Sequence, residues 1–151
     1  MKVSAISLAV FLLISLTSVA SDSDRKHIVH KRPPAAAGLP FSDGVLVGNT
    51  LYIAGHIGMD PATGRPAADA EQEAKLVMDG VQQTVEAAGL KMDDLVSVQV
   101  FCSDVSLYDT FNKVYRTYFT GEYPARAFLG SGKLLFGARY EVMGVAVKPS
   151  K

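Results

Sequence analysis

Residues 121–147 begin Gly121-Glu122-Tyr123-Pro124-Ala125-Arg126-Ala127-Phe128-Leu129 and, after a glycine-broken segment, end Arg139-Tyr140-Glu141-Val142-Met143-Gly144-Val145-Ala146-Val147. Inside the apolar part of each stretch stands one charged residue, Arg126 in the first and Glu141 in the second. A half-buried arginine needs an anion, and a half-buried glutamate needs a donor or a raised pKa, because an unpaired charge out of water is costly. Two interpretations remain open. Either the two residues form a structural ion pair or face solvent, or Arg126 holds an anionic ligand while Glu141 handles a proton.

The segments before this stretch predict two amphipathic helices. The first is expected over residues 74–88, because apolar side chains recur there at helical spacing up to a glycine that supplies the C-terminal stop. Ser106 and Asp109 have capping-box spacing and predict the start of a second helix, which ends at Gly121. Asn112 lies at the flank of its apolar stripe, where an asparagine is usually solvated but could also reach into an interface.

The remaining apolar runs predict β-strands. They cover residues 45–47 and 51–54, expected as a hairpin, and then 96–102, 125–129 and 139–148. In the run 96–102 Val96, Val98, Val100 and Cys102 share one face, so we interpret Cys102 as a core residue rather than a nucleophile. The order strand, strand, helix, strand, helix, strand, strand predicts an α+β domain, with a mixed β-sheet and two helices on one face.

The other face of that sheet is also expected to need cover. The strands carry more apolar side chains than two short helices can hide: Tyr52, Ile53, Phe101, Phe128, Val145 and Val147. Association into a homo-oligomer is the economical solution.

The N-terminal part of the chain differs in composition from the rest. Residues 1–20 combine Lys2, an apolar run and Ser18-Val19-Ala20, which is typical of a secretory signal peptide cut after Ala20. We therefore expect an exported protein, periplasmic or secreted, with no membrane segment after cleavage. Residues 21–38 lack apolar periodicity and predict a flexible tail or linker before a domain at 39–148.

Histidines, charge and cysteine narrow the possible classes of site. His27 and His30 in the tail have a spacing that could bind metal, but no third ligand is near, so no metal site is predicted. His56 follows a strand and could line a pocket or be a satisfied hydrogen-bonding residue. Basic and acidic residues balance at 15 each, which argues against nucleic acid as the main partner. With one cysteine, no intrachain disulfide is possible.

Several short motifs occur together in one order. They are Leu39-Pro40-Phe41-Ser42, Ile53-Ala54-Gly55-His56-Ile57-Gly58-Met59-Asp60-Pro61-Ala62-Thr63-Gly64, Glu86-Ala87-Ala88-Gly89-Leu90, Phe111-Asn112-Lys113-Val114-Tyr115, Tyr123-Pro124-Ala125-Arg126 and Tyr140-Glu141-Val142. Together they resemble the Rid family, also called YjgF, over about Leu39 to Lys148. This resemblance implies a chorismate-mutase-like α+β fold that assembles into a homotrimer with clefts between subunits.

The resemblance also implies an activity, the hydrolysis of reactive 2-imino acids such as 2-iminobutanoate and 2-iminopropanoate to 2-oxo acids and ammonia, with no metal or organic cofactor. The family's carboxylate-binding arginine falls on Arg126, its water-orienting glutamate on Glu141 and its helix asparagine on Asn112. These residue types suit the chemistry, because a guanidinium binds a planar carboxylate bidentately and a carboxylate beside a water can relay protons.

Three positions depart from the family pattern. The cleft tyrosine is Phe41, the serine before the Gly-Gln pair is Ala54, and the cysteine two positions past the arginine is Phe128. Phe128 could narrow the cleft, and His56 could supply a new donor. Two alternatives to an imine deaminase therefore stay open. One is a non-catalytic trimer that binds small carboxylates or acts like a chaperone; the other is a ribonuclease, against which the charge balance and the lack of a histidine pair inside the domain argue.

Overall fold

The computed structural model describes residues 25–31 and 38–149. Its strands are β1 Arg25–Ile28, β2 Gly44–Val47, β3 Thr50–Ile57, β4 Met59–Asp60, β5 Arg65–Pro66, β6 Leu95–Cys102, β7 Ala125–Gly130 and β8 Tyr140–Val147, and its helices are α1 Ala70–Ala87 and α2 Tyr108–Tyr115. Short 3-10 turns cover Met92–Asp94, Val105–Leu107, Arg116–Tyr118 and Leu135–Gly137. The predicted signal peptide, residues 1–20, lies outside the described part of the chain.

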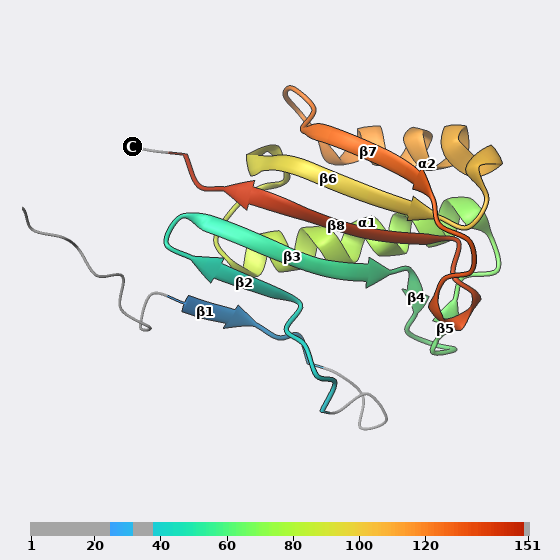
Figure 1. The fold of residues 1–151 in the computed structure, drawn as a ribbon, viewed down its shortest axis with the longest axis horizontal. Helices are drawn as coiled ribbons and strands as arrows, with labels where there is room; N and C mark the ends of the chain where they lie inside the picture. Colours follow the sequence, from blue (N-terminus) through green and yellow to red (C-terminus); the bar gives the residue numbers. More distant parts are fainter. Residues whose placement is uncertain (1–24, 32–37, 150–151) are drawn as a thin grey trace, which may run out of the picture.

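Six strands form one mixed sheet in the order β1-β2-β3-β8-β6-β7 (Figure 1). β6 and β7 run parallel and are joined through α2, as parallel neighbours need a crossover connection, whereas the other neighbouring strands pair antiparallel. β4 and β5 form a separate two-stranded ribbon. The predicted α+β class, mixed sheet and two helices are confirmed.

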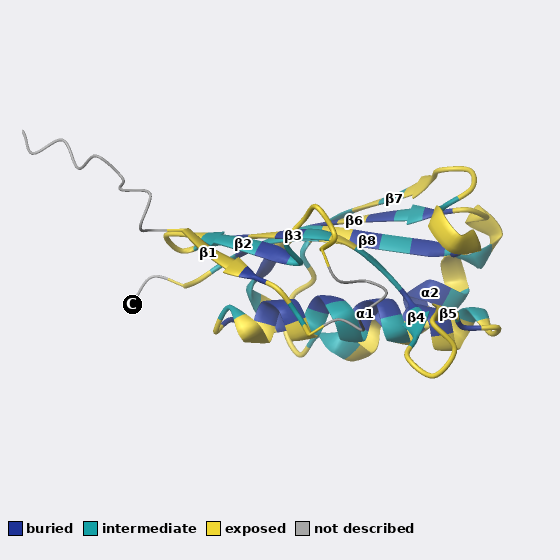
Figure 2. Ribbon diagram, turned by 90° about the horizontal axis from the view of Figure 1, so that it is seen from below, coloured by how far each residue is buried: buried dark blue, intermediate teal, exposed yellow. Residues whose placement is uncertain are grey.

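Both helices pack on the same face of the sheet (Figure 2). The core between the layers consists mainly of aliphatic side chains from α1 and from the central strands, with an aromatic cluster under α2. The largest fully buried apolar members are Tyr140, Phe111, Leu51, Met78, Val77, Val81, Val85, Val98, Val100 and Val142. Among the described residues, no helix is both long enough and apolar enough to cross a membrane.

Side-chain and backbone signals define both ends of α1. Asp69 caps the first turn, because its carboxylate accepts a 2.8 Å hydrogen bond from the backbone N–H of Gln72. At the other end Gly89 has φ +79°, and the N–H groups of Gly89 and Leu90 bond back to Glu86 and Val85. This arrangement is a Schellman motif, and it confirms the predicted glycine stop.

One part of the predicted tail is ordered. Residues 25–28 form β1, which pairs antiparallel with β2 and buries Ile28, so the expectation of a flexible tail over residues 21–38 is wrong for this segment. The backbone hydrogen bonds to β2 and a 2.9 Å bond from Lys26 Nζ to the carbonyl of Ala87 hold the strand. Because only one side chain of β1 is buried, the segment has no apolar periodicity from which a strand could be predicted.

Two local predictions also need correction. Ser106 does not cap α2; instead Asp104 accepts a 2.9 Å hydrogen bond from the N–H of Ser106 at the start of a 3-10 turn, and α2 itself begins at Tyr108. Val96 is exposed rather than inward-facing, because the register of β6 against β8 shifts between Leu95 and Ser97. Leu95 takes the buried place that the alternation assigned to Val96.

The face of the sheet away from the helices is uncovered within the single chain (Figure 2). Tyr52 on β3 pairs with Val145 on β8, and both alternate with residues that point into the core. The expected apolar excess on this face is smaller than the sequence suggested, because Ile53 is buried towards the helices and Phe128 packs under α2.

Candidate active site

Arg126 lies on β7, beside Val98 of β6, and its side chain points towards the helix layer. There Nη2 of Arg126 donates a 2.7 Å hydrogen bond to Oδ1 of Asn112 on α2. Asn112 is only 6% exposed, so the amide is a fixed part of the structure rather than a solvated side chain. The two residues that the sequence singled out on separate elements therefore meet, and Asn112 fixes one edge of the guanidinium.

Aromatic rings surround the same guanidinium. Arg126 Cζ lies 4.5 Å from the ring centroid of Tyr115 and 5.8 Å from that of Tyr108, both on α2. This position permits a cation–π contact, which holds the guanidinium plane while leaving the rest of its donors for a ligand.

Tyr115 itself carries a buried hydroxyl that has no hydrogen-bond partner among the described residues. Burial raises the pKa of Tyr115 to about 12, although the charge of Arg126 acts in the opposite direction. The phenol is thus neutral at physiological pH. A buried donor without an acceptor costs roughly 1–3 kcal/mol, so a ligand or a second subunit that supplied an acceptor here would gain free energy.

A pocket of about 230 Å³ opens beside Arg126. Its walls are Tyr108, Tyr115, Tyr123 and Pro124, and its polar lining consists of Asn112, Arg116 and Arg126. No carboxylate lines it. A concave site with aromatic walls and two cations suits a small planar anion.

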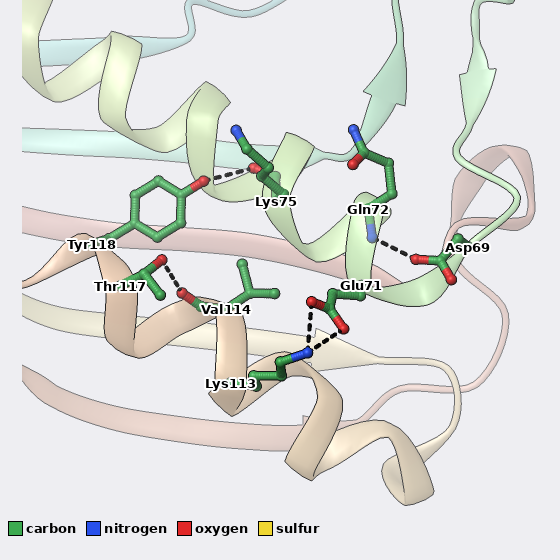
Figure 3. Close-up of a pocket in the computed structure, with 8 residues that line it drawn as sticks. All are labelled: Asp69, Glu71, Gln72, Lys75, Lys113, Val114, Thr117 and Tyr118. Atoms are coloured by element: carbon green, nitrogen blue, oxygen red, sulfur yellow. Dashed lines mark hydrogen bonds and ion pairs between the residues drawn. The ribbon is translucent and has the colours of Figure 1, made fainter.

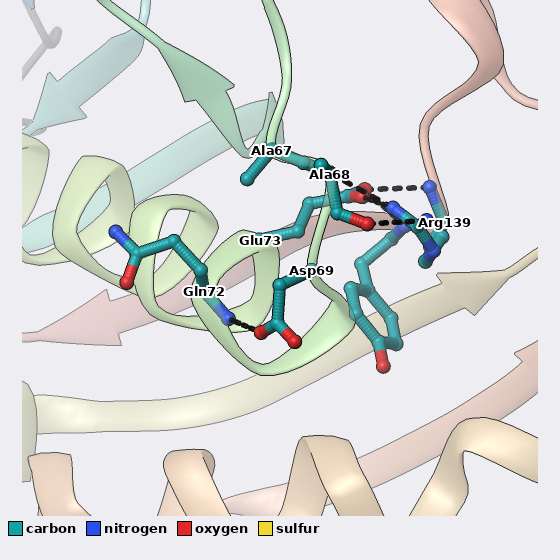
Figure 4. A network of polar contacts seen from close by, with 7 residues as sticks. Ala67, Ala68, Asp69, Gln72, Glu73 and Arg139 are labelled. Atoms are coloured by element: carbon teal, nitrogen blue, oxygen red, sulfur yellow. Dashed lines mark hydrogen bonds and ion pairs between the residues drawn. The ribbon is translucent and has the colours of Figure 1, made fainter.

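Arg126 makes no ion pair with any residue in the described ranges, so the intrachain ion pair that the sequence left open is not formed there. The buried ion pair of this domain is a different one. Glu73 on α1 is fully buried, and its Oε2 lies 2.7 Å from Nη1 of Arg139 (Figure 4). Its Oε1 also accepts hydrogen bonds from the backbone N–H groups of Arg139 and Tyr140, at 2.5 and 3.2 Å. This pair anchors the start of β8.

Glu141 lies on the open face of the sheet. Its neighbours in β8, Tyr140 and Val142, are both buried towards the helices, so the side chain between them points the other way. A β-bulge in β3 at residues 54–55 brings Gly55 under the carboxylate, and a Cβ at Gly55 would lie 2.1 Å from Glu141 Oε1. A side chain at position 55 would therefore require the Glu141 carboxylate to move.

Arg126 and Glu141 therefore occupy opposite faces of one sheet. Asn112, Phe128 and the tyrosines of α2 belong with Arg126, whereas Glu141 lies with Gly55 next to Ala54 on the open face. A single chain does not assemble the complete set of candidate residues. A site that used both charges would need a second copy to bring them together.

The three departures from the family pattern lie in different surroundings. Phe128 packs edge-on against Tyr108, with centroids 5.0 Å apart, and lies 5.7 Å from Phe111, so within one chain it supports the aromatic wall rather than lining the pocket. Phe41 is half exposed in the segment before β2. Ala54 is anchored by a backbone bond from its N–H to the carbonyl of Asp43.

His56 is a hydrogen-bonded residue facing α1 and does not line the pocket beside Arg126. Its Nδ1 lies 2.8 Å from the carbonyl oxygen of Ala54, and its Nε2 lies 2.9 Å from Oγ1 of Thr84, which is fully buried on α1. His30 Nε2 contacts the same hydroxyl at 2.9 Å. Two histidines thus contact one hydroxyl on α1, because the segment that follows β1 places His30, which lies outside the predicted domain, alongside α1.

A second, larger hollow of about 400 Å³ lies between α1 and α2 (Figure 3). Both of its lysines are already paired: Lys113 bonds to both carboxylate oxygens of Glu71, at 2.9 and 2.8 Å, and Lys75 lies 2.7 Å from Oδ2 of Asp79. Tyr118 also donates to Lys75 O at 3.1 Å. Because these groups already bind one another, few charged groups remain to bind a ligand. In the described part of the chain no three His, Cys, Asp or Glu side chains group as a metal site would require.

Sequence reasoning missed the aromatic walls and Arg116. Tyr108, Asn112 and Tyr115 fall on one face of a helix by their spacing, and that pattern could have identified the wall. Tyr123 and Arg116 carry no such signal, because only the path of the chain after α2 brings them to the same pocket.

Comparisons with known proteins identify the family of this chain. A family model described as Endoribonuclease L-PSP matches residues 30–148. A protein of Bos taurus named 2-iminobutanoate/2-iminopropanoate deaminase is 40% identical over 126 residues, covering 82% of this chain and 90% of its own.

Two solved structures from E. coli are similar over most of the fold. The YjgF gene product has a TM-score of 0.74 at 35% identity, covering 82% of this chain and 99% of its own. TdcF, solved with bound serine, has a TM-score of 0.73 at 32% identity, covering 82% of this chain and 100% of its own.

Proposed function

The chain belongs to the Endoribonuclease L-PSP (YjgF/Rid) family, and on this premise we propose that it hydrolyses reactive 2-imino acids to 2-oxo acids and ammonia. The observation that carries this proposal is that the Arg126 guanidinium is held in place but not neutralised by a carboxylate of the described residues. The guanidinium is held on one side by Asn112, faces a pocket without carboxylates and has no ion-pair partner in the described residues. Relatives named as 2-iminobutanoate/2-iminopropanoate deaminases support the reaction class.

Arg126 binds the substrate carboxylate in this proposal. The hydrogen bond to Asn112 and the ring of Tyr115 orient the guanidinium before the ligand arrives, which lowers the entropy lost on binding. A bidentate contact then fixes the plane of the 2-imino acid. The bound serine of the E. coli TdcF structure is a small carboxylate, which is consistent with this class of ligand.

In this proposal the Glu141 that orients the water belongs to a different copy of the chain from the Arg126 that binds the substrate. Because it lies on the opposite face of the sheet from Arg126, we propose that open faces pack together in a homotrimer whose intersubunit clefts join the two residues. The half-exposed Tyr52 and the neighbouring strand residues of this face supply the apolar surface that such packing would cover.

The chemistry needs only proton transfer and attack by water. The imine carbon of the substrate is already electrophilic, so water that is oriented by the Glu141 carboxylate adds to it and gives a carbinolamine. The carboxylate accepts a proton from the water and returns it to the nitrogen. The same carboxylate then takes the hydroxyl proton of the carbinolamine and passes it to the nitrogen as the C–N bond breaks, so that ammonia leaves and the carbonyl of the 2-oxo acid forms. Arg126 and Asn112 keep the carboxylate in place throughout.

The test is a coupled assay. An amino-acid oxidase acting on alanine generates 2-iminopropanoate, and the release of ammonia and pyruvate is followed with and without the purified protein. Acceleration that depends on Arg126 supports the proposal. If the protein binds pyruvate or 2-oxobutanoate yet leaves the rate of imine hydrolysis unchanged, the non-catalytic carboxylate-binding alternative replaces it. That alternative is favoured by the apolar residues Phe41, Ala54 and Phe128 at positions where the family carries polar groups.

Export is a separate proposal that rests on residues 1–20 alone. Expression of the full chain in a bacterial host, followed by cell fractionation and N-terminal sequencing, tests it. A mature chain beginning at Ser21 outside the cytoplasm is the expected result, and an uncleaved cytoplasmic chain contradicts it.

A further inference from the structure

We infer that Arg116 makes the pocket beside Arg126 selective for 2-imino and 2-oxo acids that carry a second carboxylate at the far end of the side chain. This inference rests on the anion site proposed above. Arg126 takes the carboxylate next to the reacting carbon. Arg116 takes the distal one. The substrate class is thus the imino acids derived from acidic amino acids rather than from small neutral ones.

The first support is the charge of the pocket. Arg116 and Arg126 both line it, and none of its lining residues is acidic. In the described part of the chain the side chain of Arg116 makes no ion pair and no hydrogen bond. Two cations facing one small space repel each other, and a ligand with two anionic groups neutralises both, whereas a monocarboxylate neutralises one.

The second support is the difference between the two arginines. Arg126 is partly buried, bonded to Asn112 and packed on Tyr115, so it holds its group at a fixed place. Arg116 is exposed and directly follows the last residue of α2. A long, solvated side chain at the rim of a pocket is suited to a group whose distance from the reacting carbon varies with the length of the ligand.

The third support is size and wall chemistry. At about 230 Å³ the pocket lies below the roughly 300–1,000 Å³ that drug-sized ligands occupy, and it fits a short acid chain. Its tyrosine rings offer an apolar surface between the two cations, against which the methylene groups of a dicarboxylate can pack. A dicarboxylate of four or five carbons combines two charged ends with such a linker.

Arg116 could instead serve only the helix, since a cation at a helix C-terminus interacts favourably with the helix dipole. The two roles have different signatures. A purely structural Arg116 changes the melting temperature of Arg116→Gln and leaves ligand preference alone, whereas a ligand-binding Arg116 changes preference.

The experiment compares three proteins by isothermal titration calorimetry: the parent, Arg116→Gln and Arg65→Gln. Arg65 is an exposed arginine on β5 that does not line the pocket, so its variant removes the same charge elsewhere. The probes are 2-oxobutanoate, with one carboxylate, and 2-oxoglutarate, with two. Each titration is run at low and at high ionic strength.

We expect the parent and Arg65→Gln to bind 2-oxoglutarate about tenfold more tightly than 2-oxobutanoate, the scale of one charge-assisted contact. Arg116→Gln should lose that preference, because its affinity for 2-oxoglutarate falls about tenfold more than its affinity for 2-oxobutanoate. The preference should also shrink at high salt, because Arg116 is exposed and its charge is screened.

Two results would overturn the inference. Equal affinity of the parent for the two acids, or an equal loss in Arg116→Gln and Arg65→Gln, removes the role of Arg116 while leaving the Arg126 site intact. Failure of the parent to bind either acid removes the anion site itself, and the proposed function with it.

Discussion

Arg126 and Glu141, the two charges within the apolar runs of the C-terminal third, project from opposite faces of the same sheet. Arg126 reaches α2, whereas Glu141 lies over Gly55 on the uncovered side. The proposed reaction needs both residues at one substrate, so it makes assembly a condition of activity.

Removing the charge of Arg126 should abolish affinity without unfolding the domain. With no ion-pair partner in the described residues, Arg126→Met leaves no carboxylate stranded, so the melting temperature should change little. Affinity for 2-oxobutanoate should fall on the order of 10-fold to a few hundredfold, the worth of a sheltered bidentate contact. Arg126→Lys keeps the charge and should recover part of the loss. A collapsed melting temperature with unchanged binding would mean that the residue is structural.

Glu141→Gln should retain binding and lose turnover. Glutamine preserves the shape of the side chain but cannot accept a proton from water, so kcat for 2-iminopropanoate should fall by roughly 10²-fold while the affinity for 2-oxobutanoate is kept. Glu122→Gln is a matched control, because Glu122 is exposed and forms no hydrogen bond or ion pair within the described ranges. Imine hydrolysis at the parental rate in Glu141→Gln would exclude the proton-transfer role.

The protein should be a trimer in solution, and a charge on the open face should dissociate it. Val145 is at the centre of that face on β8, opposite Tyr52, so Val145→Lys would bury a lysine in the proposed interface. Light scattering should report three chains for the parent and one for the variant, with deaminase activity lost alongside. Gln83→Lys, on the exposed side of α1, is the control and should remain trimeric. A monomeric and active parent contradicts the intersubunit site.

The Glu73–Arg139 pair should be a major local contribution to stability. Arg139→Met leaves a fully buried carboxylate with only backbone donors, and the free energy of unfolding should fall by about 3–5 kcal/mol. The double variant Glu73→Gln with Arg139→Met should recover part of this, because it removes the stranded charge. Urea denaturation followed by circular dichroism measures both. An Arg139→Met domain of parental stability would show that the pair contributes nothing net.

The hydroxyl of Thr84 should hold β1 and the β3 bulge against α1 through the two histidines. Thr84→Val removes the partner shared by His30 Nε2 and His56 Nε2 and should cost roughly 1–3 kcal/mol of unfolding free energy. Thr84→Ser keeps the hydroxyl and should cost less, although it loses a buried methyl group. Hydrogen exchange should show earlier opening of residues 25–28 in the valine variant only. Identical exchange in both variants argues against the contact.

The sequence by itself determined the two helices, the strands β2, β3, β6, β7 and β8, and the layering of helices on a sheet. Helical spacing ending in Gly89 and strand alternation through Val98 and Val100 are local signals, because each depends on a period set by backbone geometry. The family motifs around Arg126 and Asn112 could also be recognised from the sequence. That the two side chains meet at 2.7 Å was not predicted from sequence, because they lie on different elements.

Tertiary structure alone decided the rest. Val96 faces out because a register shift interrupts the alternation, and Ile28 is buried because β1 pairs with β2, which no local period records. Likewise, only the β6-α2-β7 crossover and the turn after it bring Arg116 and Tyr123 to the Arg126 pocket. Such placements depend on contacts between distant segments, and the physical terms that set them, packing and hydrogen-bond register, leave no pattern in a short stretch of sequence.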